Sequence, residues 1–350
     1  MQIGTCGSEI FKVRGRDWLA LGARSRERLV ERAFQYWRIH GFPHFSLSSM
    51  DVQREFGNLA SHPSITMCRN GIAGSNAGLR LANFYQPQMW SVRVNRYMSP
   101  RDVFNNDVLL RAAIRRSWSI WPDRFGANPA SLRRMLKTFP GAASVSNFRP
   151  TIAQAVLDHF SSSEGTIVDF SAGYGGRLLG SLTRKRRYIG IEPCRAQIVG
   201  LRKMMASLRR SQPPGSAEIL GGCAEDLMPQ LPSSFADLVF SSPPYFDWEK
   251  YAFESSQSFV RHPNYESWKA GFLEPILLES ARILRKGGRL VLNVSAGRRK
   301  PSVNDVRSAG VAVGLKYLGC IPLLITRVPY LHPRNHLPHK REALLVFLKR

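Results

Sequence analysis

The residues best suited to chemistry in this sequence are Ser242, Pro243, Pro244 and Tyr245. They follow a run of apolar residues, Ala236–Phe240, that predicts a buried strand. The two prolines fix the backbone, so that carbonyl groups can point toward a ligand instead of pairing in a sheet. Ser242 adds a hydroxyl acceptor and Tyr245 a flat apolar face, which together suit a planar base with an amino group. A given four-residue string is expected about 0.002 times in a chain of this length, at about 5% usage per residue, so we favour this hypothesis over a plain turn.

A glycine-rich turn follows another short apolar run and begins at Asp169. Glycines at positions 173, 175 and 176 permit a tight turn and a close approach of the backbone to a ligand beneath a helix N-terminus. The next apolar run ends at Glu192, a distance of 192 − 169 = 23 residues, where an acidic residue suits the two hydroxyls of a ribose. The phosphate-binding pattern GxxxxGK[ST] is absent from the sequence, so a nucleoside-containing ligand without a triphosphate fits better.

The elements that must position these turns alternate between short apolar runs and helix-like stretches, which predicts a largely parallel sheet with helices on both faces. The predicted strands are Thr166–Phe170, Tyr188–Ile191, Ala217–Leu220, Ala236–Phe240, Arg289–Val294, Ile321–Val328 and Ala343–Leu348. The predicted helices are Thr151–Phe160, Gly176–Thr183, Cys194–Arg210 and Tyr265–Leu284. No helix separates the last two strands, which indicates an antiparallel pair. A sheet of this kind binds its ligand at the carboxyl ends of the strands.

The N-terminal region has a different pattern. Apolar residues recur at helical spacing over Arg24–His40 and Asn106–Trp118, and the spacing predicts that Trp37 and Trp118 belong to the core. The passage between them is rich in Gly, Asn and Ser and predicts loops and short elements. We therefore expect two domains, a mainly helical basic region at 1–125 and an α/β domain at 126–350.

Composition limits the function classes. The 350 residues include 50 Lys and Arg against 25 Asp and Glu, which gives a formal net charge of +25. The excess is spread over both halves, so nucleic acid is the expected partner. The sequence shows neither a membrane span nor a signal peptide, and we expect a cytoplasmic protein without a membrane partner. Five scattered cysteines fit neither a disulfide framework nor a zinc module.

The segments Asp169–Gly176 and Ser242–Tyr245 together resemble the S-adenosylmethionine (SAM)-dependent DNA amino-methyltransferases, which modify N4 of cytosine or N6 of adenine. The resemblance covers about Pro129 to Arg350, and its upstream part is Asn147–Pro150. It implies a Rossmann-like methyltransferase sheet with an antiparallel last strand, SAM as cofactor and DNA as substrate. A target base inside a duplex must then be flipped out to reach the site.

The resemblance also implies roles for individual residues. Those implied for the target amine are Ser242, Pro243, Pro244 and Tyr245. Those implied for the cofactor are Phe148, Arg149, Pro150, Asp169, Ser171, Gly173, Gly175, Glu192 and Glu225. The family's usual polar contact to the cofactor's adenine is replaced by Cys223, and Asp226 either serves there or caps the following helix. Serine at position 242 favours cytosine N4 over adenine N6. The motif order leaves target recognition to the N-terminal region.

Several alternatives stay open at this stage. The substrate is DNA or, as the nearest alternative, RNA; a third hypothesis is a non-catalytic nucleic-acid-binding protein on a methyltransferase scaffold. The basic runs Arg184–Arg187 and Arg298–Lys300 are phosphate contacts or solvated charges. The aromatic residues Trp248, Tyr251 and Phe253 either wall the base pocket or pack under a loop. Prolines among His332, His336 and His339 argue against a metal site there.

Overall fold

The computed structural model describes residues 9–67, 70–295, 300–324 and 342–350. These residues form two compact units. Residues 9–46 and 87–145 make up the first unit, and residues 47–86, 146–324 and 342–350 make up the second. The two units are described separately below.

The second unit is built on a seven-stranded sheet in the order β4-β3-β2-β5-β7-β9-β8. Its strands are β2 (Thr166–Asp169), β3 (Arg187–Glu192), β4 (Ser216–Gly221), β5 (Ala236–Ser241), β7 (Leu284–Ser295), β8 (Lys316–Leu323) and β9 (Glu342–Leu348). Neighbouring strands from β4 to β7 pair in parallel, and β9 pairs antiparallel with both β7 and β8. The predicted α/β class with an antiparallel last strand is confirmed.

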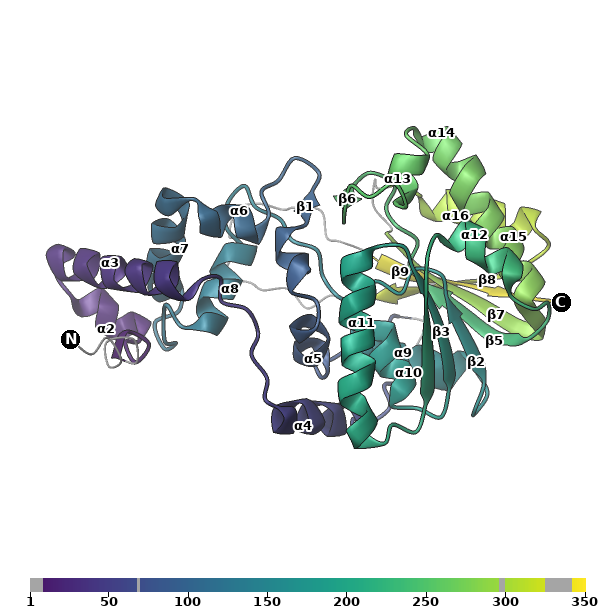
Figure 1. Cartoon of the computed structure of the whole chain (residues 1–350), viewed down its shortest axis with the longest axis horizontal. Coiled ribbons are helices and arrows are strands. Elements are labelled where there is room, and N and C mark those ends of the chain that lie inside the picture. Colours follow the sequence, from purple (N-terminus) through teal and green to yellow (C-terminus); the bar gives the residue numbers. More distant parts are fainter. Residues whose placement is uncertain (1–8, 68–69, 296–299, 325–341) are drawn as a thin grey trace. The chain divides into compact units, whose positions relative to one another are not determined.

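Helices cover both faces of this sheet (Figure 1). Successive strand residues point to opposite faces, so Ile167 belongs to the core under α9, α10 and α11, whereas Val168 belongs to the core under α15 and α16. The helices of this unit are α4 (Ser49–Ala60), α5 (Leu79–Phe84), α9 (Pro150–Phe160), α10 (Gly176–Leu182), α11 (Arg195–Leu208), α12 (Ala224–Leu227), α13 (Ser258–Arg261), α14 (Tyr265–Trp268), α15 (Glu274–Ile283) and α16 (Val303–Ala312). Shorter elements are the 3₁₀ turns η2 (Arg209–Ser211) and η3 (Met228–Gln230), strand β6 (Glu249–Lys250) and the π-helical turn η4 (Lys269–Leu273).

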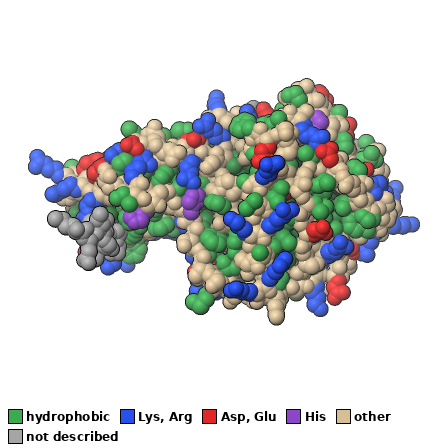
Figure 2. Space-filling model, in the orientation of Figure 1, with side chains coloured by type: hydrophobic (Ala, Val, Ile, Leu, Met, Phe, Trp, Pro, Cys, Tyr) green, Lys and Arg blue, Asp and Glu red, His purple; other side chains and the backbone are tan. Residues whose placement is uncertain are grey.

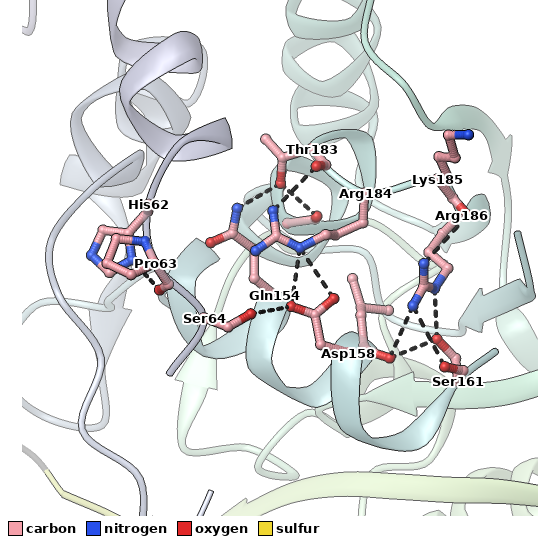
Figure 3. Close-up of polar contacts among 12 residues, drawn as sticks. His62, Pro63, Ser64, Gln154, Asp158, Ser161, Thr183, Arg184, Lys185 and Arg186 are labelled. Atoms are coloured by element: carbon pink, nitrogen blue, oxygen red, sulfur yellow. Dashed lines mark hydrogen bonds and ion pairs between the residues drawn. The ribbon is translucent and has the colours of Figure 1, made fainter. Parts of the chain in front are cut away.

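The division of the chain corrects the predicted boundary after residue 125. Residues 47–86 belong to the unit with the sheet, because α4 and α5 bury apolar side chains such as Phe56 and Leu81 against its core. Polar contacts add to this attachment (Figure 3). Ser64 donates to Asp158 at 2.8 Å, as Figure 3 shows. Gln154 on α9 also donates to the Leu59 carbonyl at 2.9 Å. The segment is too rich in Gly, Asn and Ser to predict this packing from periodicity.

The first unit is mainly helical, as predicted. Its elements are α2 (Gly15–Ala20), α3 (Ala23–His40), η1 (Pro87–Ser91), β1 (Arg93–Val94), α6 (Pro100–Asn105), α7 (Asp107–Ser119) and α8 (Pro129–Lys137). Trp37 and Trp118 are buried, at 4% and 0% exposure, which confirms their place in the core. The Trp37 indole donates to the Ala127 carbonyl at 3.0 Å, so residues after 125 complete this unit.

Several details of the second unit differ from the predicted elements; strand β7, for example, begins at Leu284, five residues before the predicted Arg289. Strand β8 begins at Lys316, five residues before the predicted start, because it lies at the sheet edge and alternates exposed with partly buried residues instead of forming an apolar run. Helix α16 was not predicted. Its N-terminus is capped by Ser302, whose side chain accepts from the Asp305 amide in a capping box. Among the described residues, no helix is both long and apolar enough to cross a membrane.

Candidate active site

A cavity that is open to solvent lies at the carboxyl ends of β2, β3 and β5, where a sheet of this type binds its ligand. The volume that water can occupy in it is about 160 Å³. Both predicted motifs reach it. Its lining includes Phe148, Ser171, Gly173, Glu192, Glu225, Ser242, Pro243, Pro244 and Tyr245. The fold therefore brings most of the predicted site residues together at this cavity.

The glycine-rich turn is held in shape from both sides. Gly173 and Gly175 have φ values of +59° and +85°, which side chains other than glycine rarely adopt. Asn147 clamps the turn because its side-chain oxygen accepts from the Gly176 amide at 3.1 Å and its amide donates to the Tyr174 carbonyl at 3.0 Å. A methyl group at Gly176 would lie 1.9 Å from the Phe148 carbonyl oxygen, so this position requires glycine.

Asp169 does not line the cavity. Its side chain is fully buried and pairs with the Arg177 guanidinium at 2.6 and 3.2 Å. It also accepts from Tyr188 at 2.6 Å and from Ser241 at 2.7 Å. One carboxylate thus joins the ends of β2, β3 and β5 to the first turn of α10. Its oxygens face protein donors, which favours a role in shaping the glycine-rich turn over the implied direct contact with the cofactor.

Glu192 does line the cavity, and its carboxylate is held by backbone amides. Its two oxygens accept from Gly173 at 2.8 Å and from Cys194 at 2.9 Å. With the amide of Gln197 turned so that its nitrogen faces Glu192, that nitrogen donates to both oxygens at 3.1 Å. Burial raises the pKa of Glu192 to about 7, although the two backbone donors oppose the shift.

The second predicted motif, Ser242–Tyr245, is held in place by contacts with Asn293 of β7. Ser242 donates its hydroxyl hydrogen to the Asn293 carbonyl at 3.2 Å, and the Asn293 side-chain amide donates to the Ser242 oxygen at 3.4 Å. The same amide donates to Glu342 at 3.2 Å, which fixes its orientation because a carboxylate only accepts. Asn293 is 4% exposed, and its side-chain oxygen is buried without a hydrogen-bond donor among the described residues. All three residues line the cavity.

Aromatic side chains form part of the cavity wall. Tyr245 is 7% exposed and lies among the lining residues, together with Tyr174 and Tyr251. The rings of Tyr174 and Tyr251 meet edge to face with centroids 6.0 Å apart, and the Tyr251 hydroxyl donates to Glu249. Of the three aromatic residues left open by the sequence, only Tyr251 lines this cavity; Phe253 is 79% exposed.

Glu225 lines the cavity at the start of α12 and forms an ion pair of 2.9 Å with Arg261. Burial raises its pKa above the usual value. Asp226 pairs with Arg261 at 2.8 Å, and the structure assigns it no capping bond on α12. The Cys223 thiol donates to the Ser256 carbonyl at 3.4 Å, so it helps to hold the loop that closes this side of the cavity.

Three further residues with an implied cofactor role, Arg149, Pro150 and Gly175, lie outside the lining. Arg149 donates to the Gly74 carbonyl at 2.8 Å, and Pro150 begins α9. They attach the preceding loop to the unit, and only Phe148 of this group reaches the cavity. The reason is that a proline at the first helical position directs the chain into α9 and away from the turn.

The basic run Arg184–Arg187 is also placed away from the cavity, at the amino end of β3 (Figure 3). Arg184 pairs with Asp158 at 3.1 Å, and Arg186, which is buried, donates to the Ser161 hydroxyl at 2.8 Å. These side chains hold the end of α9, which favours a structural role over phosphate contacts. Lys300 pairs with Asp305 at 3.3 Å, whereas Arg298 and Arg299 lie outside the described residues.

Other predictions concern residues beyond the described parts. His332, His336, His339, Cys6 and Cys68 lie outside the described residues. Within the described ranges, no three His, Cys, Asp or Glu side chains are grouped as metal ligands. The three described cysteines, Cys194, Cys223 and Cys320, are free thiols.

Sequence reasoning missed several residues of the cavity. Asn293 lies at the carboxyl end of a strand that was predicted, so the rule that chemistry gathers at such ends could have found it. Glu342 lies at the start of the antiparallel β9, which brings it to the same edge. Gln257, whose buried side-chain nitrogen has no acceptor among the described residues, belongs to a loop that gave no signal.

Comparison with known proteins finds no family model and no curated protein that matches the sequence. Solved structures with a similar fold include a TehB-like SAM-dependent methyltransferase from Corynebacterium glutamicum, at 16% identity and a TM-score of 0.35, covering 63% of this chain and 96% of that one. A methyltransferase from Pyrococcus furiosus has 16% identity and a TM-score of 0.39, with 57% and 82% covered. A geranyl diphosphate C-methyltransferase from Streptomyces coelicolor has 14% identity and a TM-score of 0.39, with 63% and 80% covered. At these values, the activity of this chain must be argued from its own residues.

Proposed function

We propose that this protein is a SAM-dependent methyltransferase that methylates the exocyclic amine of a base in DNA, with cytosine N4 as the favoured target and adenine N6 as the second. The observation that carries the proposal is a pair of hydrogen-bond acceptors in the cavity wall, the Ser242 hydroxyl oxygen and the Asn293 side-chain oxygen.

The Ser242 oxygen has one lone pair left for a ligand. Its hydrogen is donated to the Asn293 carbonyl, and one lone pair accepts from the Asn293 amide. Among the described residues the Asn293 side-chain oxygen has no donor, and a buried acceptor left in this state costs about 1–3 kcal/mol. An amino group carries two N–H donors and would satisfy both oxygens. Hydrogen bonds of this kind draw the amine nitrogen out of conjugation with the ring and aim its lone pair into the cavity, so positioning supplies much of the catalysis.

The residues of the cavity also fit the proposed cofactor. The Gly173 backbone leaves room for close approach, since a methyl group there would meet no atom nearer than 3.6 Å, and the Glu192 carboxylate lies in the cavity lining, where ribose hydroxyls can donate to it. Gln257 offers a buried donor beside Glu225, where the adenine is expected. When bound, SAM supplies a methyl group on a sulfonium centre. No cysteine nucleophile is required, and Cys223 is held by the Ser256 carbonyl.

Tyr245 provides a face on which the target base can stack. A base paired inside a duplex cannot reach a cavity lined in this way, so the proposal requires that it be flipped out or already single-stranded. Stacking on an aromatic side chain offsets part of the unstacking cost.

The proposal is tested by nucleoside mass spectrometry on DNA and RNA from cells that express the wild-type protein. The matched control is a Ser242→Ala, Asn293→Leu double variant, which lacks both acceptors. We expect N4-methylcytosine in DNA from wild-type cells only, and the double variant to bind S-adenosylhomocysteine with wild-type affinity in calorimetry.

Each other outcome changes a defined part of the proposal. N6-methyladenine in DNA would keep the chemistry and replace the base. A new methylated nucleoside confined to RNA would overturn DNA as the substrate in favour of the RNA hypothesis. Absence of any new methylated nucleoside, together with failure of the wild-type protein to bind S-adenosylhomocysteine, would favour a non-catalytic nucleic-acid-binding protein.

The raised pKa of Glu192 gives a pH-dependence for cofactor binding. Ribose hydroxyls donate to the ionised carboxylate, and this form is lost as the pH falls through about 7. We expect the dissociation constant of S-adenosylhomocysteine to be constant above pH 8 and to rise toward tenfold per pH unit below 7, since one unit corresponds to about 1.36 kcal/mol. Isothermal titration calorimetry from pH 6 to 9 measures it. Glu192→Gln should bind weakly at every pH; a wild-type constant unchanged between pH 6 and 8 would remove Glu192 from the ribose site.

A further inference from the structure

Helix α11 has an outer face of a single charge sign that begins at the rim of the cavity. Residues 193–217 contain five basic and no acidic residues. The five are Arg195, Arg202, Lys203, Arg209 and Arg210, and all are exposed; the last two belong to η2, which continues α11 and is counted with its face below. In Figure 2, Lys and Arg side chains gather along the course that α11 follows in Figure 1.

The spacing places these cations on one side of the helix. Arg195, Arg202 and Arg209 follow one another at seven-residue intervals, which is close to two helical turns, and Lys203 and Arg210 repeat the interval one position later. The opposite side of α11 is buried by Leu201, Met204 and Leu208. The cations therefore form a row about 22 Å long, at about 1.5 Å per residue.

The inner side of α11 is closely covered, so the basic face is the side that remains for a partner. A methyl group at Gly200 would lie 2.3 Å from the Tyr85 carbonyl oxygen, which shows how near the 47–86 segment approaches. Within the described parts of the chain, none of Arg202, Lys203, Arg209 and Arg210 forms an ion pair with an acidic side chain.

The row starts where the cavity ends. Pro193 and Gln197 line the cavity, and Arg195 lies between them in the sequence at the first residue of α11. A chain of phosphates that passes the cavity can therefore continue along the helix. The basic run Arg184–Arg187 does not share this continuity, since Arg184 and Arg186 are engaged by Asp158 and Ser161 at the opposite end of β3.

We infer that the basic face of α11, defined by Arg195, Arg202, Lys203, Arg209 and Arg210, is the surface that binds the DNA backbone beside the target-base cavity. The inference rests on the proposed function for the identity of the nucleic acid. Charge complementarity selects a polyanion, and the row of cations suits successive phosphates without reading sequence. Its expected signature is a salt-dependent contribution to affinity that is the same for all DNA sequences.

The test compares two fourfold variants that remove the same charge. One is Arg202→Ala, Lys203→Ala, Arg209→Ala, Arg210→Ala. The matched control is Lys185→Ala, Lys286→Ala, Lys316→Ala, Arg350→Ala, whose four exposed side chains lie at the amino-end edge of the sheet or at the chain end. Binding of a fluorescent DNA duplex is measured by anisotropy over a range of NaCl concentrations.

For the α11 variant we expect the dissociation constant to rise about tenfold or more at 0.1 M NaCl, and the slope of log affinity against log salt to lose about 0.9 for each phosphate contact removed. For the control variant we expect this slope to fall by less than about 0.9, the amount that one phosphate contact contributes. Both variants should bind S-adenosylhomocysteine as the wild type does.

The outcomes separate this inference from the proposed function. Equal losses in the two variants would mean that net charge alone drives binding and would overturn the inference, as would a wild-type slope in the α11 variant. Preference for an RNA oligonucleotide, or binding to phosphatidylserine vesicles in place of DNA, would overturn DNA as the occupant. Loss of DNA binding in the α11 variant of a protein that methylates no DNA would leave the inference standing and reject the proposed activity.

Discussion

Replacing Tyr245 with alanine is expected to lower kcat/KM for methyl transfer to DNA by roughly 5- to 150-fold, because a base stacked on an aromatic side chain loses about 1–3 kcal/mol when that side chain is removed. Tyr245 lies in the cavity wall beside Ser242, at 7% exposure. The dissociation constant of S-adenosylhomocysteine should stay within about twofold of the wild-type value, since none of the residues proposed to hold the cofactor lies in the Ser242–Tyr245 turn.

Two control variants distinguish stacking from packing. Tyr245→Phe keeps the ring and should retain most of the activity. Tyr245→Leu fills much of the same volume without a π face, so it should keep the melting temperature closer to wild type than alanine does and still lose activity. Wild-type turnover in Tyr245→Leu would reject the stacking role, because an apolar side chain would then be sufficient at this position.

Much of the sheet could be predicted from the sequence, because buried parallel strands appear as short apolar runs between helices. The run Ala236–Phe240 became β5 with one residue added, and Thr151–Phe160 became α9. The same logic failed at β8, where an edge strand exposes alternate residues and begins at Lys316. Periodicity reports burial, so it is weakest where one side of an element faces water.

The site was predictable at its motifs and less so at the residues that complete them. Ser242 and Glu192 were found because each follows a predicted strand and reaches the cavity. Asn293 was missed because its importance depends on a contact with Ser242 across 51 positions. The contact between Asn293 and Glu342 likewise joins two strands that only the sheet topology brings together. Such pairings are a property of the register and carry no local signal.

The division into two units shows the same limit at a larger scale. A change in the pattern of apolar residues near residue 125 predicted one domain boundary, whereas the chain passes from one unit to the other near residues 46, 86 and 145. Helix α4 packs against the sheet unit through Phe56 and Leu59, although most of the N-terminal region belongs to the other unit. The composition of a segment predicts its local structure, but the surface against which the segment packs decides the unit to which it belongs.

The contacts of Asp169 support a different role from the one implied by the resemblance. Its replacement has the largest expected effect on the stability of the protein. Asp169 and Arg177 are 0% and 6% exposed, and although burial opposes the charge on Arg177, its partner carboxylate raises the pKa of the guanidinium. Removing one member of a buried pair leaves the other uncompensated, at a cost of about 3–5 kcal/mol. We therefore expect Asp169→Ala to lower the melting temperature by roughly 10 °C, at about 2–4 °C per kcal/mol.

The double variant Asp169→Leu, Arg177→Met decides between the two roles. An apolar pair removes the uncompensated charge, so the melting temperature should recover part of the loss; the rest remains because the Tyr188 and Ser241 hydroxyls lose their acceptor. If Asp169 acts by shaping the turn at Gly173, the double variant should restore that turn. Its affinity for S-adenosylhomocysteine, measured by calorimetry at a temperature where all variants are folded, should then recover as well. If the double variant is more stable than Asp169→Ala but binds S-adenosylhomocysteine as weakly, the carboxylate itself contacts the cofactor. The position of Asp169 argues for recovery, since its side chain is fully buried and lies outside the cavity lining, whereas Glu192 lines the cavity.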